Sequence, residues 1–580
     1  MKKTANQKIW KMMSLLLCLG MFVFTSCDPE AWLPDDDDPE NVDPGQDDDD
    51  PPVVVEGDWT KPINEAIVWD GNFSVKGTVY VNAELTIKPG SIIVFHEDAR
   101  LYVQNEGTIK AEGTAEKPIT FKAREKGADW LRIYINNNAG KSSKFAYCHI
   151  SGAETGIYVY QNKVSIDNCV IKDCSVNGVY LHGESEFGSF TANTISDCEE
   201  YPLVIPFLQA NEVTSDNEIS GIGICLTGNY VGKKNGKVTI HEQTIPYVMP
   251  NSWFEINDNA EVTIEPGVTI AMSEDAYIKI GNGTSGKLTA VGTEEKPITF
   301  TSNLTDKAAG DWDGLKFERY NSKSSALKYC NFEYCGNGYG AIYLYDTSIA
   351  LENCKITNCE NYGVYAYDGA TFSSFTGNVI ESTGLYPLRC NAAAAGKIGD
   401  DNQFGELGIE IIGNYLTDDA TWANHKVPYT LAVSWFEINE GNTLTISPGV
   451  TVQMSESAYM KIGNGSEGKL VAEGTEEEPI IFTSAMNDKF PGDWVGLKFE
   501  RYAGAGSILN HCKVLYAETG LYFYGCAGKV TIQNSEIAYS ENYGIYIYNE
   551  EAMPVLSNNT YHDNNGGNKI NGTEYTDAEM

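Results

Sequence analysis

The hexapeptide LTIKPG at Leu85–Gly90 decides the fold of this chain, and it recurs as VTIEPG at Val262–Gly267 and as LTISPG at Leu444–Gly449. In each copy, apolar residues alternate with polar ones, which is typical of a short strand with one buried face. Proline cannot donate a hydrogen bond to a sheet and glycine accepts a positive φ, so the Pro-Gly pair predicts a sharp corner. Apolar alternation resumes at once after the corner. Strand, corner and strand, with no helical run between them, predict stacked coils.

A longer repeat surrounds the hexapeptide. The related phrases GTAEKPITF, GTEEKPITF and GTEEEPIIF begin at Gly113, Gly292 and Gly474. Their spacing of roughly 180 residues indicates three copies of one module. We therefore predict module 1 with an N-terminal cap at 58–228, module 2 at 229–413, an incomplete module 3 at 414–565 and a polar C-terminal tail at 566–580.

A shorter period lies inside each module. TGIYVY at 155–160 returns as NGVYLH at 177–182, and YGAIYLY at 339–345 returns as YGVYAY at 362–367, so one coil holds about 22 residues. From about residue 59 to 565, this all-β pattern resembles the right-handed parallel β-helix of the pectin-lyase-like superfamily. The resemblance implies a fold but not an activity, because this fold carries lyases, hydrolases, adhesins and structural rods.

The N-terminal region is typical of a targeting segment and a spacer. In residues 1–26, four lysines precede an apolar stretch too short to be a stop-transfer helix. The stretch ends FTSC, so Cys27 resembles the lipidated cysteine of bacterial lipoproteins; an ordinary secretory peptide is the alternative. Residues 27–57 form an acidic linker, which we expect to be a disordered, solvated spacer; calcium binding by its two DDDD runs is the alternative.

The start of the linker gives the expected location. Asp28, Pro29 and Glu30 resemble the export signal of surface lipoproteins in the Bacteroidetes. This resemblance implies that an N-terminal lipid holds the protein in the outer membrane and that the protein faces the exterior. The formal net charge of −39 argues against nucleic acid as a partner.

The cysteines follow the coil period. Two of the 14 cysteines, Cys148 and Cys169, occupy equivalent places in successive coils, and so do Cys335 and Cys359. We expect a ladder of buried free thiols. Disulfides between neighbouring coils are the alternative, because strands about 4.8 Å apart are within reach of one another. The Cys and His spacing does not indicate a zinc site, and the sequence implies no cofactor.

Tyrosine gives the strongest surface signal. The apolar residues of each two-coil motif face inward, so the alternating tyrosines face outward. Their flat faces and hydroxyl groups suit an extended polysaccharide or a cell-surface glycan, whereas the alternative is that they only stabilise the sheet. The predicted ligand residues are Tyr158, Tyr160, Tyr180, Tyr343, Tyr345, Tyr365, Tyr367, Tyr522, Tyr524, Tyr546 and Tyr548.

A second group recurs in two modules. GDWDGLKFERY at 310–320 and GDWVGLKFERY at 492–502 place Arg319 and Arg501 beside lysine, glutamate and aromatic residues. Such a group could hold a sugar acid, so both arginines are candidate ligand residues. Module 1 lacks the charged residues, which favours the alternative of an exposed ion pair.

The sequence shows no recognisable catalytic set. The aspartate strings of polygalacturonases are absent, and so are the calcium cage and base of pectate lyases. We therefore predict a lipid-anchored, surface-exposed β-helix that binds or adheres to extracellular glycans without catalysis. Two alternatives stay open: a polysaccharide lyase or glycoside hydrolase whose site is built across coils, and a structural spacer.

Overall fold

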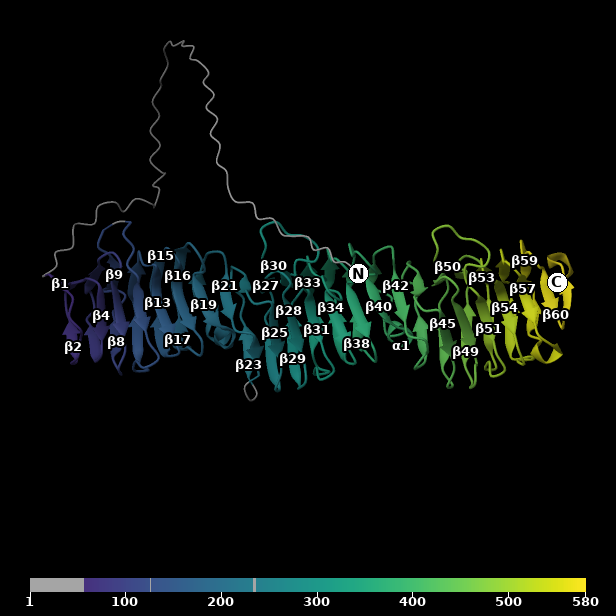
Figure 1. Ribbon diagram of the computed structural model, residues 1–580, viewed down its shortest axis with the longest axis horizontal. Helices are drawn as coiled ribbons and strands as arrows, with labels where there is room; N and C mark the ends of the chain where they lie inside the picture. Colours follow the sequence, from purple (N-terminus) through teal and green to yellow (C-terminus); the bar gives the residue numbers. More distant parts are fainter. Residues whose placement is uncertain (1–56, 126, 233–235) are drawn as a thin grey trace, which may run out of the picture. The chain divides into compact units, whose positions relative to one another are not determined.

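The computed structural model describes residues 57–125, 127–232 and 236–580. These residues form an all-β parallel solenoid of about 21 turns, so the predicted fold class is confirmed. Figure 1 shows the strands stacked coil upon coil. Helix within the described residues is limited to the single turn α1 (Ala392–Ala395) and the short 3-10 segments η1 (Phe207–Glu212), η2 (Glu550–Ala552) and η3 (Asp577–Glu579).

The hexapeptides form the expected strand and corner. Their strands are β5 (Glu84–Ile87), β26 (Ala260–Ile264) and β46 (Thr443–Ile446). The closing glycines Gly90, Gly267 and Gly449 have φ values of 83°, 85° and 76°, which strain any residue with a Cβ. The strands after the corner are β6 (Ile92–Phe95), β27 (Thr269–Met272) and β47 (Thr451–Met454).

Two 14-stranded sheets join successive modules. One sheet runs from β4 (Thr78–Val81) to β41 (Gln403–Phe404), and the other runs from β22 (Tyr230–Val231) to β59 (Thr560–His562). The first sheet contains tyrosine-bearing strands of module 1 and also β27, the strand after the Pro-Gly corner of module 2. Near each expected module joint, two sheets end while one 14-stranded sheet continues. The module boundaries themselves stay a prediction.

Tryptophans fill corresponding places in the core. Trp130, Trp312 and Trp494 are the last residues of the phrase ADW at 128–130 and of the GDW phrases at 310–312 and 492–494, and all three are fully buried. Each indole N–H donates a 2.9 Å hydrogen bond to a backbone carbonyl in the next coil, those of Ser151, Glu333 and Leu515 respectively. A buried tryptophan needs such an acceptor, so these residues stabilise the coil. The tryptophans of the GDW phrases are therefore core residues and not part of a surface site.

The cysteine ladder is present and free. Every cysteine within the described residues is a free thiol, and nearly all are buried, which confirms the favoured prediction. The sulfur atoms of Cys335 and Cys359 lie 3.7 Å apart on neighbouring coils. Burial raises the pKa of the Cys335 thiol well above its usual value, which keeps it protonated and unreactive.

We expect thiol reagents to label the folded protein selectively. Cys198 is partly exposed, and a hydrogen bond from Cys174 lowers its pKa, so it should react before the buried cysteines of the solenoid. Alkylation under native conditions followed by peptide mass mapping measures this order. Labelling of Cys335 as fast as Cys198 would show that the coils are not closely packed.

The two ends of the solenoid close differently. At the N-terminal end, the expected cap forms β1 (Asp58–Trp59) and β2 (Ile67–Trp69), the short strands of a first coil. At the C-terminal end, the expected polar tail contains β60 (Asn568–Ile570), which extends a seven-stranded sheet, and β61 (Thr573–Tyr575), which pairs with it antiparallel. The Asn-Gly pair between these strands is a hairpin signal, and the antiparallel strand covers the sheet edge.

The predicted targeting segment, Cys27 and almost all of the acidic linker lie outside the described residues. Of the helices that are described, none is long and apolar enough to span a bilayer.

Candidate functional site

The predicted tyrosines face outward and stand in register on neighbouring coils. Tyr343 lies opposite Tyr365, and Tyr345 lies opposite Tyr367. Tyr158 and Tyr180 pair in the same way in module 1, as do Tyr522 and Tyr546 in module 3. The strands are β13 (Thr155–Tyr160) and β16 (Asn177–His182) in module 1, β34 (Ile342–Tyr345) and β37 (Val364–Tyr367) in module 2, and β54 (Thr519–Phe523) and β57 (Tyr543–Ile547) in module 3.

In module 1 the tyrosine rings form a closed stack. Tyr102, Tyr134, Tyr158 and Tyr180 lie on successive strands, with ring centroids 4.6, 5.1 and 5.0 Å apart and nearly parallel planes. Burial raises the pKa of Tyr134 to about 12. Because each ring face is covered by its neighbour, a ligand would meet only ring edges. This geometry favours the structural interpretation for module 1, whose stack also extends to residues that the sequence analysis did not select.

Module 2 leaves its tyrosines more open. Tyr343 and Tyr365 meet edge to face, with centroids 5.5 Å apart and planes at 77°, and Tyr365 and Tyr367 meet at 75°. Tyr367 is 44% exposed. Tyr365 and Tyr367 line a groove of about 750 Å³, together with Tyr415 and Arg389. The groove thus combines two of the predicted residues with Tyr415 and Arg389, which were not among the predicted ligand residues.

A partly buried ion pair supports the wall of this groove. Arg389 lies 5.1 and 4.9 Å from the ring centroids of Tyr362 and Tyr365, and its guanidinium is 3.1 Å from the carboxylate of Glu410. It also donates a hydrogen bond to the Tyr362 hydroxyl. Burial raises the pKa of Glu410, and the nearby Arg389 charge opposes that rise. This pair could not be anticipated from the sequence, because its members lie on different coils and stand where module 1 has the uncharged residues Val204 and Cys225.

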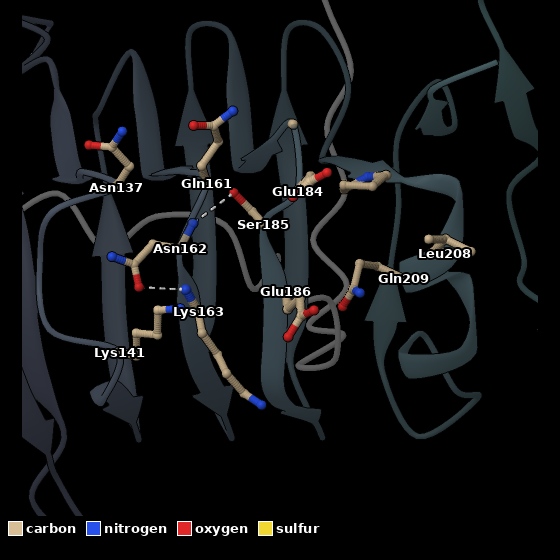
Figure 2. A pocket seen from close by; sticks show the side chains of 12 residues that line it. Asn137, Lys141, Gln161, Asn162, Lys163, Glu184, Ser185, Glu186, Leu208 and Gln209 are labelled. Carbon is tan, nitrogen blue, oxygen red and sulfur yellow. Dashed lines mark hydrogen bonds between the residues drawn. The ribbon is translucent and has the colours of Figure 1, made fainter. Parts of the chain in front are cut away.

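Module 1 carries a smaller pocket at the corresponding turn, which Figure 2 shows in close-up. It measures about 540 Å³ and lies beside η1, as the larger groove lies beside α1. Amide and charged side chains such as Gln161, Glu186 and Gln209 line it, and tyrosine is absent from its lining. The Asn162 side chain is occupied, because its oxygen accepts a 2.7 Å hydrogen bond from the backbone N–H of Lys163. This pocket therefore lacks the aromatic surface of the module 2 groove.

The two candidate arginines have different surroundings. Arg319 is 2.8 Å from the carboxylate of Asp346 and lies over the ring of Tyr345 at 5.2 Å. Arg319 thus forms an exposed ion pair, as the alternative interpretation expected, but its partner is Asp346 and not the neighbouring glutamate of the repeated phrase. Arg501 lies over Tyr524 at 5.5 Å, and no carboxylate in the described part of the chain comes within 4 Å of it.

Metal binding finds no support in the described residues. In residues 57–125, 127–232 and 236–580, no group of three or more His, Cys, Asp or Glu side chains is placed to hold a metal ion.

Two family models match parts of the chain. Residues 232–356 and 413–539 match a pectate-lyase like beta helix domain, and residues 132–266 match a right handed beta helix region. Comparison with curated proteins gave no match. The two family matches and the parallel solenoid together support a pectate-lyase-like β-helix, and they are consistent with a carbohydrate-associated protein.

Proposed function

We propose that this chain, whose coils are similar to pectate-lyase β-helix domains, is a lipid-anchored protein of the outer membrane surface that binds glycans through its tyrosines. The observation that carries the proposal is the groove of module 2, where Tyr365 and Tyr367 lie beside Tyr415 and Arg389. Sugar rings present apolar C–H faces and polar hydroxyl edges, and tyrosine offers a matching flat face with a hydroxyl group. Concave sites of this size with aromatic walls and a few polar groups are typical ligand sites.

Some polar side chains of the groove already form hydrogen bonds within the protein, whereas others are available to a ligand. Asn391 is structural, because its amide nitrogen donates to the carbonyl of Ala370 at 3.0 Å and its oxygen accepts from the N–H of Ala394 at 2.8 Å. Lys397 and Thr417 are exposed, and no described residue forms a hydrogen bond with their side chains. These two side chains are thus free to meet the hydroxyl groups of a bound saccharide.

Replacing Tyr367 and Tyr415 by serine should weaken glycan binding roughly tenfold or more, because each aromatic contact is worth about 0.5–1.5 kcal/mol. The two side chains are 44% and 50% exposed, so the melting temperature should change little. A glycan array on the full-length protein, followed by titration of the best glycan, measures the effect. Tyr320→Ser is the matched control, because Tyr320 is 54% exposed and lies outside the groove. A sharp fall in melting temperature with unchanged binding per folded molecule would leave the tyrosines a structural role only.

A polysaccharide lyase or glycoside hydrolase is the second candidate function. The observation that favours it is the raised pKa of Glu410 beside the groove, since perturbed carboxyl groups cluster at catalytic sites. Against this, Arg389 already pairs with the carboxylate, and the Glu410 side chain is only 11% exposed. We expect no shortening of polysaccharides that bind the protein. Chain cleavage by the wild type that Glu410→Gln abolishes would favour the enzyme instead.

A further inference from the structure

We propose that the outward face of the seven-stranded sheet in module 3 is an anion-binding surface for a polysaccharide that carries sulfate or carboxylate groups. This inference rests on the proposed function in that the ligand is a glycan, but its site is distinct from the groove of module 2. The cations on this face are Lys461 on β48 (Tyr459–Ile462), Lys498 on β51 (Gly496–Phe499), Arg501 just after β51, and Lys569 on β60.

These side chains share one column. Lys461, Lys498, Tyr522, Tyr546 and Lys569 lie opposite one another on successive parallel strands. Residues in register on parallel strands point to the same side of the sheet, so the column faces outward with its tyrosines. Strands β51, β54, β57 and β60 of this sheet lie toward the yellow end of Figure 1.

The first two lysines form a repelling pair. Lys461 and Lys498 are directly opposite in register, and their ammonium groups lie 5.3 and 4.8 Å from the ring centroid of Tyr459. Like charges placed opposite each other destabilise a sheet. Burial and Lys461 lower the pKa of Lys498, while Glu518 and Glu500 raise it from a distance greater than that of an ion pair. A chain with a net charge of −39 thus keeps cations together without carboxylates in contact.

Module 2 has cations at the same four places, and three of them are paired with carboxylates. The fourth, Lys279 at the place of Lys461, forms no ion pair with a described residue. Lys316 and Arg319 correspond to Lys498 and Arg501 in the repeated GDW phrase. Lys316 forms an ion pair with Asp313, and Arg319 forms one with Asp346 at 2.8 Å. Arg389, at the place of Lys569 in the column, pairs with Glu410.

Module 3 lacks the counterparts of Asp313 and Asp346 while keeping the cations. Glu437 and Glu574 lie opposite Lys461 and Lys569 in register, but within the described residues neither forms an ion pair with that lysine. Val495 stands at the place of Asp313, and Gly525 stands at the place of Asp346. No aspartate or glutamate oxygen of the described chain lies within 4 Å of the charged groups of Lys461, Lys498, Arg501 or Lys569. Neighbouring like charges without a counter-charge destabilise a fold, and residues that lower stability in this way are expected at functional sites.

A bound oxyanion would supply the negative charge that these cations lack. A sulfate or carboxylate between Lys461 and Lys498 would accept hydrogen bonds from both ammonium groups and relieve their repulsion. Arg501, held over the ring of Tyr524, presents a planar guanidinium that matches either anion. Because Lys461 and Lys498 lie on neighbouring coils and Lys569 lies three coils beyond Lys498, repeated charges along one polymer can be met at more than one place, which strengthens binding through avidity.

The test introduces the two aspartates of module 2 at the corresponding positions of module 3. A Cβ at Gly525 would lie 3.5 Å from Nε of Arg501, and the φ of 65° at Gly525 resembles the φ of 46° that Asp346 adopts. The double variant Val495→Asp/Gly525→Asp should therefore fold and form both ion pairs. We expect the full-length wild type to bind dextran sulfate or polygalacturonate, in a salt-sensitive way, and not neutral dextran. The double variant should bind the same polyanion at least tenfold more weakly.

Two matched variants distinguish an effect of this cation site from an effect of the protein's net charge. Val68→Asp/Val555→Asp adds the same charge at positions that are 55% and 50% exposed on other strands, and it should keep wild-type binding. Asp313→Val/Asp346→Gly, the reverse exchange in module 2, should strengthen polyanion binding. An equal loss in the Val68 and Val555 control, or no loss in the Val495 and Gly525 variant, would overturn the inference.

The same assay keeps the two proposals apart. Tyr367→Ser/Tyr415→Ser should keep polyanion binding while losing the glycan found for the groove. A wild type that binds neither polyanion would refute the module 3 site and leave the groove untouched. Binding of single-stranded DNA more tightly than dextran sulfate would overturn the assignment of a glycan as the ligand.

Discussion

Arg389→Ala should lower the free energy of unfolding by about 3 kcal/mol, because it leaves a buried carboxylate without its cation. The Glu410 side chain is 11% exposed, and its oxygen lies 3.1 Å from the guanidinium that the variant removes. The variant also removes the packing of the guanidinium on Tyr362 and Tyr365. Urea denaturation of the variant and the wild type, followed by tyrosine fluorescence and circular dichroism, measures the difference.

The chain itself supplies the control for this variant. In module 2, Arg389 and then Glu410 lie opposite Tyr365 on the next two strands of the sheet. In module 1, Val204 and then Cys225 lie opposite Tyr180 in the same way. The double variant Arg389→Val/Glu410→Cys removes both charges together and should regain most of the lost stability. Wild-type stability of Arg389→Ala would show that Glu410 is well solvated and that the pair does not support the groove.

The cost of Arg389→Ala should depend on pH. Burial raises the pKa of Glu410 in the folded protein, and Arg389 is the main opposing influence. Without it, the folded pKa rises further above the unfolded pKa. A carboxyl group with a raised folded pKa stabilises the fold while it is protonated, and this contribution is lost as pH rises through the folded pKa. The variant should therefore be closest to the wild type at acidic pH and furthest from it near neutral pH.

Cys27→Ala should release nearly all of the protein from the membrane fraction or leave its precursor unprocessed. A lipid chain contributes about 0.8 kcal/mol for each buried CH₂ group, so its loss removes the proposed anchor. Cell fractionation and labelling with a palmitate analogue test this directly. Cys18→Ala is the matched control, because this cysteine lies inside the apolar stretch and should be dispensable. Continued labelling and membrane retention of the Cys27 variant would refute the lipid anchor.

The fold could be predicted because its signals are local and repeated. The Pro-Gly corner at Pro266 and Gly267 specifies a backbone turn directly, and alternation specifies which side chains are buried. The spacing of Tyr343 and Tyr365 predicted their pairing for the same reason, since one coil brings equivalent residues side by side.

The site was less predictable because it depends on ring orientation and on contacts between coils. Nothing in the strings TGIYVY and YGAIYLY distinguishes the closed stack of Tyr158 from the open arrangement of Tyr365. The exchange of Asp313 for Val495 is visible in the sequence, but its effect on Lys498 requires the distances between side chains. Sequence period therefore fixes which coils meet, and packing decides what their surfaces can bind.

The continuity of the two 14-stranded sheets has a mechanical consequence. Near each joint, two sheets end while a third passes through, so within the described residues no cross-section interrupts all of the hydrogen-bonded ladders at once. Tension applied between the two ends of the solenoid would be carried across each joint by the main-chain hydrogen bonds of the 14-stranded sheet that continues there. Rupture should therefore begin at the terminal coils, whose strands have a partner on one side only. A single module excised at its boundaries would end in a 14-stranded sheet that has been cut between two paired strands.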